Sequence, residues 1–174
     1  MNVPVLETER LRLRERREAD LDAFAAFCAD PATARFVGAT DRQVTWRRMA
    51  ASIGHWHLRG FGRWAVEEKA SGRWVGYAGL WSPEGWPERE LIWGLAAASQ
   101  GRGYATEAAR HARDFAYREL GWSTLASHID AANEGSLGVA RRLGASHERD
   151  IELLGQRVGV YRHPGPGQLS NLTN

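Results

Sequence analysis

Hydrophobic and polar residues alternate with two different periods along the first third of the chain. Residues 10–16 (RLRLRER) alternate one by one, which predicts a strand with one face in solvent. Residues 17–30 place their apolar side chains three and four positions apart, which predicts a helix that stops before Pro31. Residues 41–60 begin with Asp41, a favourable N-cap, so a second helix should follow.

The rest of the chain alternates between strand and helix patterns. We expect strands within residues 62–83 (two, joined by a tight turn), 88–98, 123–130, 146–154 and 157–163, and helices in residues 104–120 and 134–143. Gly121 and Gly144 follow the two helices, where a glycine commonly ends a helix. This order predicts a mixed α/β domain with a largely antiparallel sheet, about four helices and a crossover helix in the middle.

The length indicates a single domain. The 174 residues are enough for one domain with a sizeable core, which we assign to residues 1–163. Residues 164–174 form a polar tail with several prolines and glycines, which we expect to be flexible or to lie over a neighbour. Cys28 is the only cysteine, so no intramolecular disulfide can form, and the six histidines show no spacing typical of a metal site.

Charge and hydropathy argue against two classes of partner. The net charge is only +2, without the clustered excess of a nucleic-acid-binding protein, so we expect no direct contact with nucleic acid. No apolar run approaches the roughly 20 residues needed to cross a bilayer, and the charged N-terminus lacks a signal-peptide core. We therefore expect a cytoplasmic protein without membrane contact, either a monomer or a homodimer.

Two glycines flank an arginine just before the predicted helix 104–120. The first turn of a helix has backbone N–H groups without partners and carries part of the helix dipole, so it attracts anions. Gly101 and Gly103 would let a phosphate approach that backbone, and Arg102 would add a fork of donors. The residues that follow match neither a P-loop nor the dinucleotide-binding fingerprint. An ordinary glycine turn is the alternative.

A wider pattern resembles a known family. Residues 90–115 (ELIWGLAAASQGRGYATEAARHARDF) are followed by residues 133–145 (NEGSLGVARRLGA), and this combination resembles the GNAT superfamily of acyl-CoA-dependent N-acyltransferases. Residues 6–15 (LETERLRLRE) are similar to the first strand of the branch that contains the ribosomal-protein N-terminal acetyltransferases of the RimJ/RimL type. The family's pyrophosphate motif, Gln/Arg-x-x-Gly-x-Gly/Ala, is filled by Gln100, Gly103 and Ala105.

The resemblance implies a GNAT-like fold, with a seven-stranded sheet that splays open in the middle to admit acetyl-CoA. It implies that Leu95 and Ala97 lie on the strand edge beside the cofactor's pantetheine arm. Asn133 would contact that arm, and Ser136 would lie near the thioester. The pyrophosphate would bind the loop and first helical turn, namely Gln100, Gly101, Arg102, Gly103, Tyr104, Ala105 and Thr106.

Ser136 is our candidate for the acid that protonates the leaving thiolate. Many members of the family carry a tyrosine four residues later, but here that position is Ala140. Gly135 and Gly138 make a poor helix start, which suggests that something must approach closely. The structural alternative is that Asn133 is a helix N-cap and that Ser136 is an ordinary helix residue.

Glu90 is our first candidate for the base, because the family often keeps a catalytic glutamate on the strand before the pyrophosphate loop. Glu148 is the reserve, and either residue could instead be a solvated carboxylate on a strand. The base must deal with a protonated amine. A terminal α-amine, with a pKa of about 7.7–8.0, is roughly 10–20% neutral at pH 7, whereas a lysine amine is neutral in only about 0.04% of molecules.

The acceptor pocket should include the loop 80–90, which holds two tryptophans and several glutamates that would suit a cationic amine. A solvated hairpin loop is the alternative. A peptide N-terminus, a polyamine, an aminoglycoside and an amino acid are all compatible acceptors. The sequence thus predicts an acetyl-CoA-dependent N-acetyltransferase; the alternatives are a non-catalytic acyl-CoA-binding sensor and an RNA- or ribosome-associated protein.

Overall fold

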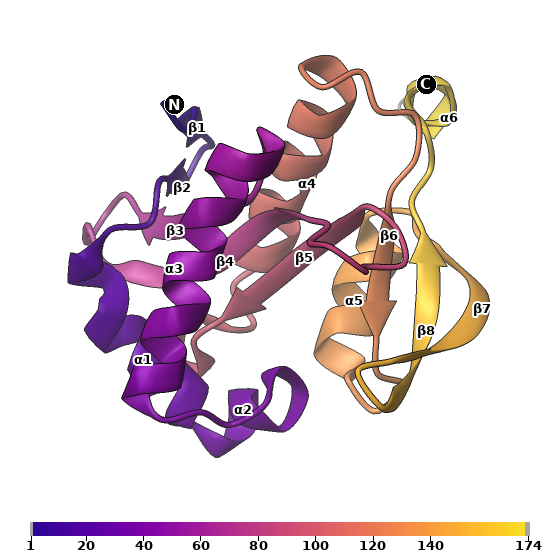
Figure 1. Cartoon of the computed structure of the whole chain (residues 1–174). Coiled ribbons are helices and arrows are strands. Elements are labelled where there is room, and N and C mark those ends of the chain that lie inside the picture. Colours follow the sequence, from indigo (N-terminus) through magenta and orange to yellow (C-terminus); the bar gives the residue numbers. More distant parts are fainter. Residues whose placement is uncertain (1, 173–174) are drawn as a thin grey trace.

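One mixed sheet runs through the whole molecule (Figure 1). The computed structural model describes residues 2–172, and within them the sheet has eight strands in the order β1-β2-β3-β4-β5-β6-β8-β7. All neighbouring strands are antiparallel except β5 and β6. The strands are β1 (Leu6–Glu7), β2 (Leu11–Arg14), β3 (Arg63–Glu68), β4 (Trp74–Trp81), β5 (Glu90–Leu95), β6 (Ala126–Ile129), β7 (Ser146–Leu153) and β8 (Gln156–Arg162).

Helices cover both faces of this sheet. In Figure 1, α1 and α3 lie on one face of the N-terminal strands and α4 lies on the other. The α-helices are α1 (Leu21–Ala29), α2 (Pro31–Val37), α3 (Arg42–Arg59), α4 (Tyr104–Arg118), α5 (Glu134–Arg142) and α6 (Pro166–Leu172), and two 3-10 turns are η1 (Glu18–Asp20) and η2 (Ala97–Ser99). The fold class and the order of the main elements along the chain agree with the prediction, but the expected counts of seven strands and about four helices were too low.

The elements that were not predicted are α2, β1 and α6, and the start of α2 has a local cause. Pro31 ends α1 as expected, but it also occupies the first position of α2, where its missing N–H costs nothing. The Asp30 side chain accepts a hydrogen bond from Ala32 N at 2.9 Å and so caps the second helix. The extra strand, β1, has only two residues. The helix α6 lies in the predicted tail, where Leu169 packs against the main core.

The main core lies between α4 and the sheet. Ala108, Ala112 and Ala116 are fully buried on one side of α4, and these small side chains let the helix lie close to the strands. A second cluster joins α1 and α3 to the opposite face of β4 and β5. The two clusters fix the N-terminal half of the sheet from both sides.

The sheet opens between β5 and β6. These parallel strands are in register at a single pair, Glu90 and Ala126. One residue further along, Ser127 Oγ donates to the Leu91 carbonyl at 2.6 Å, so a side chain satisfies an acceptor that a continued ladder would have satisfied. The two halves of the sheet are therefore joined at one end and separate towards the other.

A buried histidine supports the joined end. His163 is 2% exposed, and its Nε2 lies 2.9 Å from Ser127 Oγ. Because that hydroxyl donates to Leu91, Nε2 must carry the proton and donate to Ser127. His163 Nδ1 has no partner among the described residues. Burial lowers the pKa of His163 to about 3, and the nearby guanidinium groups of Arg113 and Arg162 act in the same direction.

This burial predicts an acid-sensitive fold. The unfolded state protonates His163 near pH 6.5, whereas the folded state stays neutral down to about pH 3, so stability falls as the pH drops through this range. We expect the contribution of His163 to fall by about 2 kcal/mol between pH 7 and pH 5. Urea unfolding at the two pH values should show this loss, and the loss should shrink in His163→Gln. His57 is exposed, so His57→Gln should leave the loss of stability between pH 7 and pH 5 unchanged. An equal loss in both variants would contradict the assignment of this loss to His163.

Candidate active site

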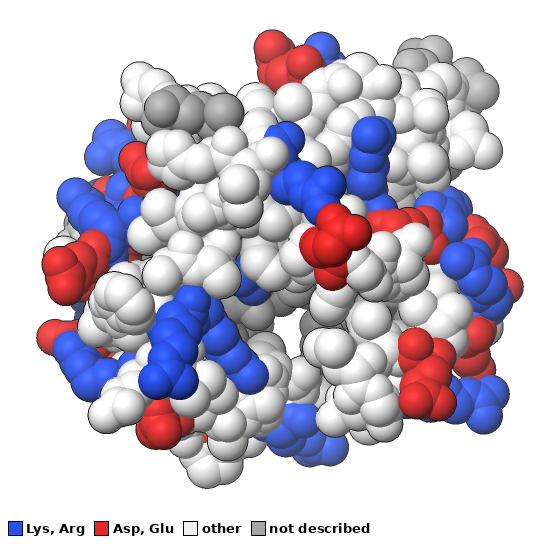
Figure 2. All heavy atoms as spheres, viewed as in Figure 1, with Lys and Arg blue, Asp and Glu red and all other residues white. Residues whose placement is uncertain are grey.

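A cavity of about 630 Å³ lies where β5 and β6 separate, and Figure 2 shows the molecule hollowed between its two halves. Three stretches of backbone meet there: the end of β5, the start of α4 and the start of α5. Helix α2 adds an apolar wall. Most of the predicted cofactor-binding residues line this cavity, namely Leu95, Gln100, Gly101, Gly103, Tyr104, Ala105, Thr106, Asn133 and Ser136.

The first turn of α4 presents backbone donors to the cavity. Gly103 is the N-cap residue with φ of 82°, and no side chain caps this helix. Gly101 has φ of 74°, and a Cβ added there would meet nothing within 4 Å. Both positions therefore favour glycine because of the left-handed backbone, and at Gly103 a Cβ would also approach Arg10 Nη2 to 3.3 Å. The uncapped N–H groups point to an anion site.

The side chains of Arg102 and Tyr104 do not serve this anion site. Arg102 Nη1 lies 2.8 Å from a carboxylate oxygen of Glu68, and the Tyr104 hydroxyl donates to the same oxygen at 2.6 Å. Hydrogen bonds from Ser71 and Tyr104, together with the charge of Arg102, lower the pKa of Glu68 to about 2. Arg102, which was expected to bind the cofactor, does not line the cavity, whereas Tyr104 does. The side chains of both residues tie the start of α4 to β3.

The strand edge differs from the prediction at one residue. Leu95 is the last residue of β5, and Gln100 Nε2 donates to its carbonyl at 3.0 Å. Ala97 was expected on this edge, but it begins the 3-10 turn η2 and does not line the cavity. The residues of β5 that do line it include Trp93 and Gly94, which the sequence analysis did not single out.

The start of α5 combines both interpretations of Asn133 and Ser136. Asn133 Oδ1 accepts from Ser136 N at 3.0 Å, so Asn133 is the N-cap of the helix. The Ser136 hydroxyl has no hydrogen-bond partner among the described residues, and Ser136 lines the cavity. Ala140 is fully buried one turn further along. Ser136 is therefore the hydroxyl that α5 offers to the cavity.

Glu90 lies at the joined end of the sheet, outside the residues that line the cavity. It is 3% exposed, and each of its carboxylate oxygens is engaged. Trp86 Nε1 donates to Oε2 at 2.9 Å, and the backbone N–H of His128 donates to Oε1 at 3.2 Å. His128 Nδ1 lies 3.4 Å from Oε1, and both ring nitrogens lack hydrogen-bond partners within the described chain.

His128 was not singled out from the sequence. The alternation within residues 123–130 places His128 on the same strand face as Ala126. The structure adds that Ala126 is the register partner of Glu90, which brings His128 next to that carboxylate.

Glu148 occupies a different place, on the outer edge of the sheet. It lies where the register of β7 shifts, is exposed, and accepts from Arg162 Nε at 2.7 Å as well as from Arg149. These contacts lower the pKa of Glu148, which makes it a weaker base. The structure does not bring Glu148 to the cavity.

The loop between β4 and β5 was expected to offer free carboxylates, but arginines neutralise them. Glu84 pairs with Arg59 at 2.8 Å. Glu88 pairs with Arg162 at 2.5 Å and with Arg149 at 3.0 Å. The two salt bridges of Glu88 link this loop to β7 and β8. They therefore connect the two halves of the sheet beside its joined end.

Two arginines at the cavity were not singled out from the sequence. Arg142, on α5, donates to Thr106 Oγ1 at 3.4 Å beside the first turn of α4. Arg35, on α2, lies over the ring of Phe36. Neither makes a salt bridge to another described residue. The signal for Arg142 was present in the RRLGA ending of the α5 segment. Both guanidinium groups suit the phosphates of a nucleotide-like ligand.

Within residues 2–172, no group of three or more histidine, cysteine or acidic side chains is placed to hold a metal ion. Nor does any helix in this part of the chain have the length and apolar character needed to span a membrane.

The sequence of the chain matches a known family. Residues 10–146 match the family model described as an acetyltransferase (GNAT) domain, which is well over half of the chain. The chain belongs to the GNAT acetyltransferase family. As a member, it is an acetyltransferase that uses acetyl-CoA as its co-substrate. The uncapped start of α4, the opening between β5 and β6, and the free arginines fit the phosphates and the extended arm of that molecule.

Individual relatives support this assignment. The chain is 29% identical to the Bacillus subtilis protein YkkB over 164 residues, covering 90% of this chain and 93% of that protein. It superimposes on an acetyltransferase from Agrobacterium tumefaciens with a TM-score of 0.83 and 34% identity, covering 94% and 95% of the two chains. RimL in complex with coenzyme A shares the fold, with a TM-score of 0.77 and 16% identity over 92% of this chain and 98% of that chain.

The position of Arg142 leads to a binding prediction. We expect Arg142→Gln to weaken coenzyme A binding about tenfold, because a charge-assisted contact to a phosphate is worth roughly 1.5–3 kcal/mol. Calorimetric titration with coenzyme A would measure this. The matched control is Arg141→Gln, since Arg141 is exposed and faces Glu134 at 3.8 Å. The same loss of affinity in both variants would show a general charge effect instead of a contact from Arg142.

Proposed function

We propose that this enzyme transfers the acetyl group to a primary amine by direct attack of the amine on the thioester. The observation that carries the proposal is the single cavity shared by the uncapped start of α4, the end of β5 and the free hydroxyl of Ser136. This arrangement allows one site to hold an anionic carrier and to expose its reactive end to a second substrate. The acceptor is a protein N-terminus or a small-molecule amine.

When bound, acetyl-CoA supplies an activated acetyl group as a thioester. We assign its pyrophosphate to the backbone N–H groups of residues 101–106, with Arg142 and Arg35 beside them. The open space above Gly101 leaves room for this approach. The amide groups of the pantetheine arm would pair with the free edge of β5 at Trp93 and Gly94, since the Leu95 carbonyl is already occupied by Gln100.

Glu90 is the proposed base and takes the proton from the attacking amine through a water molecule. Its carboxylate faces the same side of the sheet as α1 and α3, opposite the side that α4 covers. Trp86 and the His128 N–H hold it in one orientation, so it is positioned before the amine arrives. A terminal α-amine loses its proton readily, so one positioned carboxylate suffices for it.

Ser136 is the proposed acid for the departing sulfur. As the new C–N bond forms and the C–S bond breaks, the hydroxyl gives its proton to the sulfur and regains one from solvent. Two of the four tyrosines are committed elsewhere: Tyr117 donates to the Pro164 carbonyl at 2.9 Å, and Tyr104 donates to Glu68. Tyr161 packs against the cluster that contains Leu137 and Ala140 of α5, but it does not line the cavity.

A non-catalytic acyl-CoA-binding role is the second candidate. Ala140 stands fully buried at the position where the resemblance expects a tyrosine, and this observation favours a protein that binds without turnover. RimL is an α-N-protein acetyltransferase acting on ribosomal L7/L12, and another structural neighbour, AAC(6')-Ib, is an aminoglycoside acetyltransferase. These neighbours illustrate the range of acceptors that the fold serves.

Thiol release from acetyl-CoA would test the base. We would offer peptides with free Ala, Ser and Met N-termini, spermidine, an aminoglycoside and free amino acids. We expect release with one class of amine and a 10²- to 10⁴-fold lower kcat in Glu90→Gln, because general base catalysis contributes on that scale. Glu152→Gln, an exposed glutamate on β7, is the control. Coenzyme A binding without release for any amine would favour the sensor.

Replacement of Ser136 separates the acid from a binding role. Ser136→Ala keeps the backbone N–H of residue 136, which donates a hydrogen bond to Asn133 Oδ1, so α5 remains capped. We expect kcat to fall while the affinity for acetyl-CoA stays within about twofold. Steady-state kinetics and calorimetry together would measure both. Weaker binding with kcat unchanged would rule out the acid role.

A further inference from the structure

Two arginines on the face of the sheet covered by α1 and α3 are buried without a counter-charge. Arg16 is 4% exposed, and its Nε and Nη2 have no hydrogen-bond partner among the described residues. Arg63, the first residue of β3, is half-buried, and its Nε is also unpaired. Neither guanidinium makes a salt bridge within the described chain. The established activity of the family does not explain this pair.

Aromatic rings hold both guanidinium groups in place. The Arg16 guanidinium carbon lies 4.6 Å from the centre of the Phe24 ring and 5.1 Å from that of Tyr77. The Arg63 guanidinium carbon lies 5.6 Å from the Tyr77 ring and 3.8 Å from the Trp81 ring. Tyr77 therefore contacts both cations, which keeps the two positive charges close together.

The charged groups around this pair are engaged elsewhere. Asp20 forms a salt bridge at 2.7 Å with another arginine, Arg14. Glu90 accepts from Trp86 and from a backbone N–H, and Arg48 adds a third positive charge nearby. Burial, with the like charge of Arg63, lowers the pKa of Arg16 to about 9, and burial also lowers the pKa of Arg63. Asp20 and Glu90 thus act on the two guanidinium groups only from a distance, and neither guanidinium has a carboxylate in direct contact.

An uncompensated pair of like charges away from water is costly, and a bound anion removes that cost. In the predicted acceptor loop, Glu84 and Glu88 are paired with arginines, which leaves Glu90 as its carboxylate without a salt bridge to an arginine. Apart from the carboxylate of Glu90, the proposed base, the charge without a salt bridge near this pair is therefore positive, which disfavours a polyamine and favours a substrate with an anionic group.

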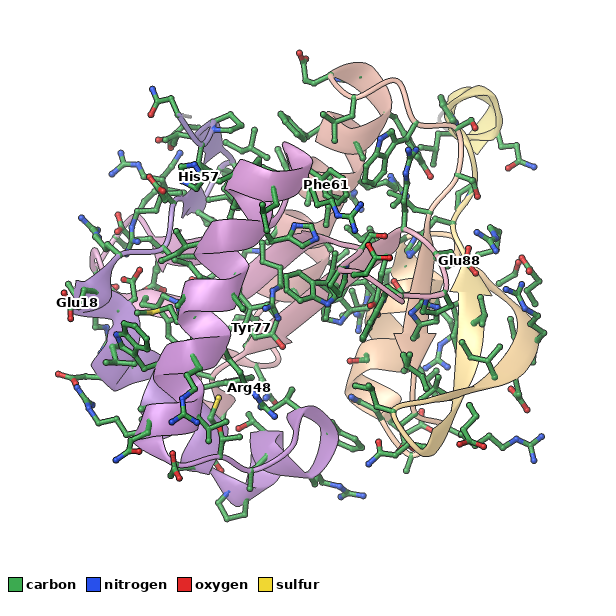
Figure 3. The ribbon with its side chains drawn as sticks, viewed as in Figure 1. Glu18, Arg48, His57, Phe61, Tyr77 and Glu88 are labelled. Carbon is green, nitrogen blue, oxygen red and sulfur yellow. The ribbon has the colours of Figure 1, made fainter. Side chains whose placement is uncertain are left out.

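The register places this anion site beside the proposed base. Arg63 pairs with Gly79 and Glu90 pairs with Trp81, so the two side chains lie on either side of β4 and share one face. Strand spacing and rise put their Cα atoms about 12 Å apart. In Figure 3, Tyr77 lies with Arg48 on the N-terminal side of the central opening. The Arg63 side chain spans much of the distance between these two Cα atoms, so one small molecule can reach both its guanidinium group and the Glu90 carboxylate.

We propose that the acceptor is a primary amine that also carries a carboxylate, which Arg63 binds directly while Arg16 supplies a second positive charge behind it. The proposal rests on the proposed function, since it names the substrate class for the same site. The amine end lies towards Glu90 and the thioester. Free amino acids and acidic peptides both supply this chemistry, and the test below distinguishes them.

The kinetic test compares acceptors that differ only in charge. We would measure kcat/KM for leucine against leucinamide, glutamate against glutamine, and peptides with an N-terminal Glu against Gln. In at least one pair, we expect kcat/KM for the acid to exceed kcat/KM for its neutral partner at least tenfold. Arg63→Met should remove that preference through KM, leaving the neutral partner within about twofold. Arg47→Met, an exposed arginine on α3, should retain the preference.

A binding test uses no acetyl transfer. In chloride-free buffer, leucine and glutamate should raise the melting temperature of the wild type but not of Arg63→Met or Arg16→Met. If the two variants lose this thermal response but the wild type acetylates no amine, the anion site is retained and the proposed function is rejected. Equal use of acids and neutral partners, an equal loss in both by Arg63→Met, or an equal thermal response in all variants would overturn the proposal.

Discussion

The active site depends on the short parallel contact between β5 and β6. Because only Glu90 and Ala126 are in register, the sheet keeps its continuity at one end and exposes two strand edges at the other. A fully paired sheet would have no free edge in its centre and no room for an extended ligand arm. Ser127 makes this interruption stable, because its hydroxyl satisfies a carbonyl that the missing ladder leaves without a partner.

Around this opening, arginines divide into two classes. Most are committed to carboxylates: Arg102 holds Glu68, Arg14 holds Asp20, and Arg162 holds Glu148 and Glu88. Four others make no salt bridge to a described residue: Arg35 and Arg142 line the cavity, and Arg16 and Arg63 lie on the face of the sheet covered by α1 and α3. This division separates positive charge that stabilises the fold from positive charge that remains available for ligands.

Much of this could be predicted from the sequence, and the failures have physical reasons. Hydrophobic periodicity reports which faces are buried, so the order of strands and helices along the chain followed from it. The loop before α4 followed from its two glycines. It does not report where a side chain goes in three dimensions. Arg102 looked like a phosphate ligand because it stands between two glycines, yet it turns to Glu68 on a strand more than thirty residues away. Ala97 continued an apolar run, yet the chain turns at that point to reach α4.

The link between α4 and the N-terminal hairpin has a consequence for mechanics. Glu107, in the first turn of α4, accepts hydrogen bonds from Thr8 and from both the backbone and the side chain of Arg10. The start of this helix is thus anchored to the far edge of the sheet by residues from the beginning of the chain. A displacement of the first turn of α4 would therefore be shared with β1 and β2. The backbone pairing of β5 with β6, by contrast, is in register at a single pair, so the anchor on the N-terminal side is more extensive than the strand pairing across the opening.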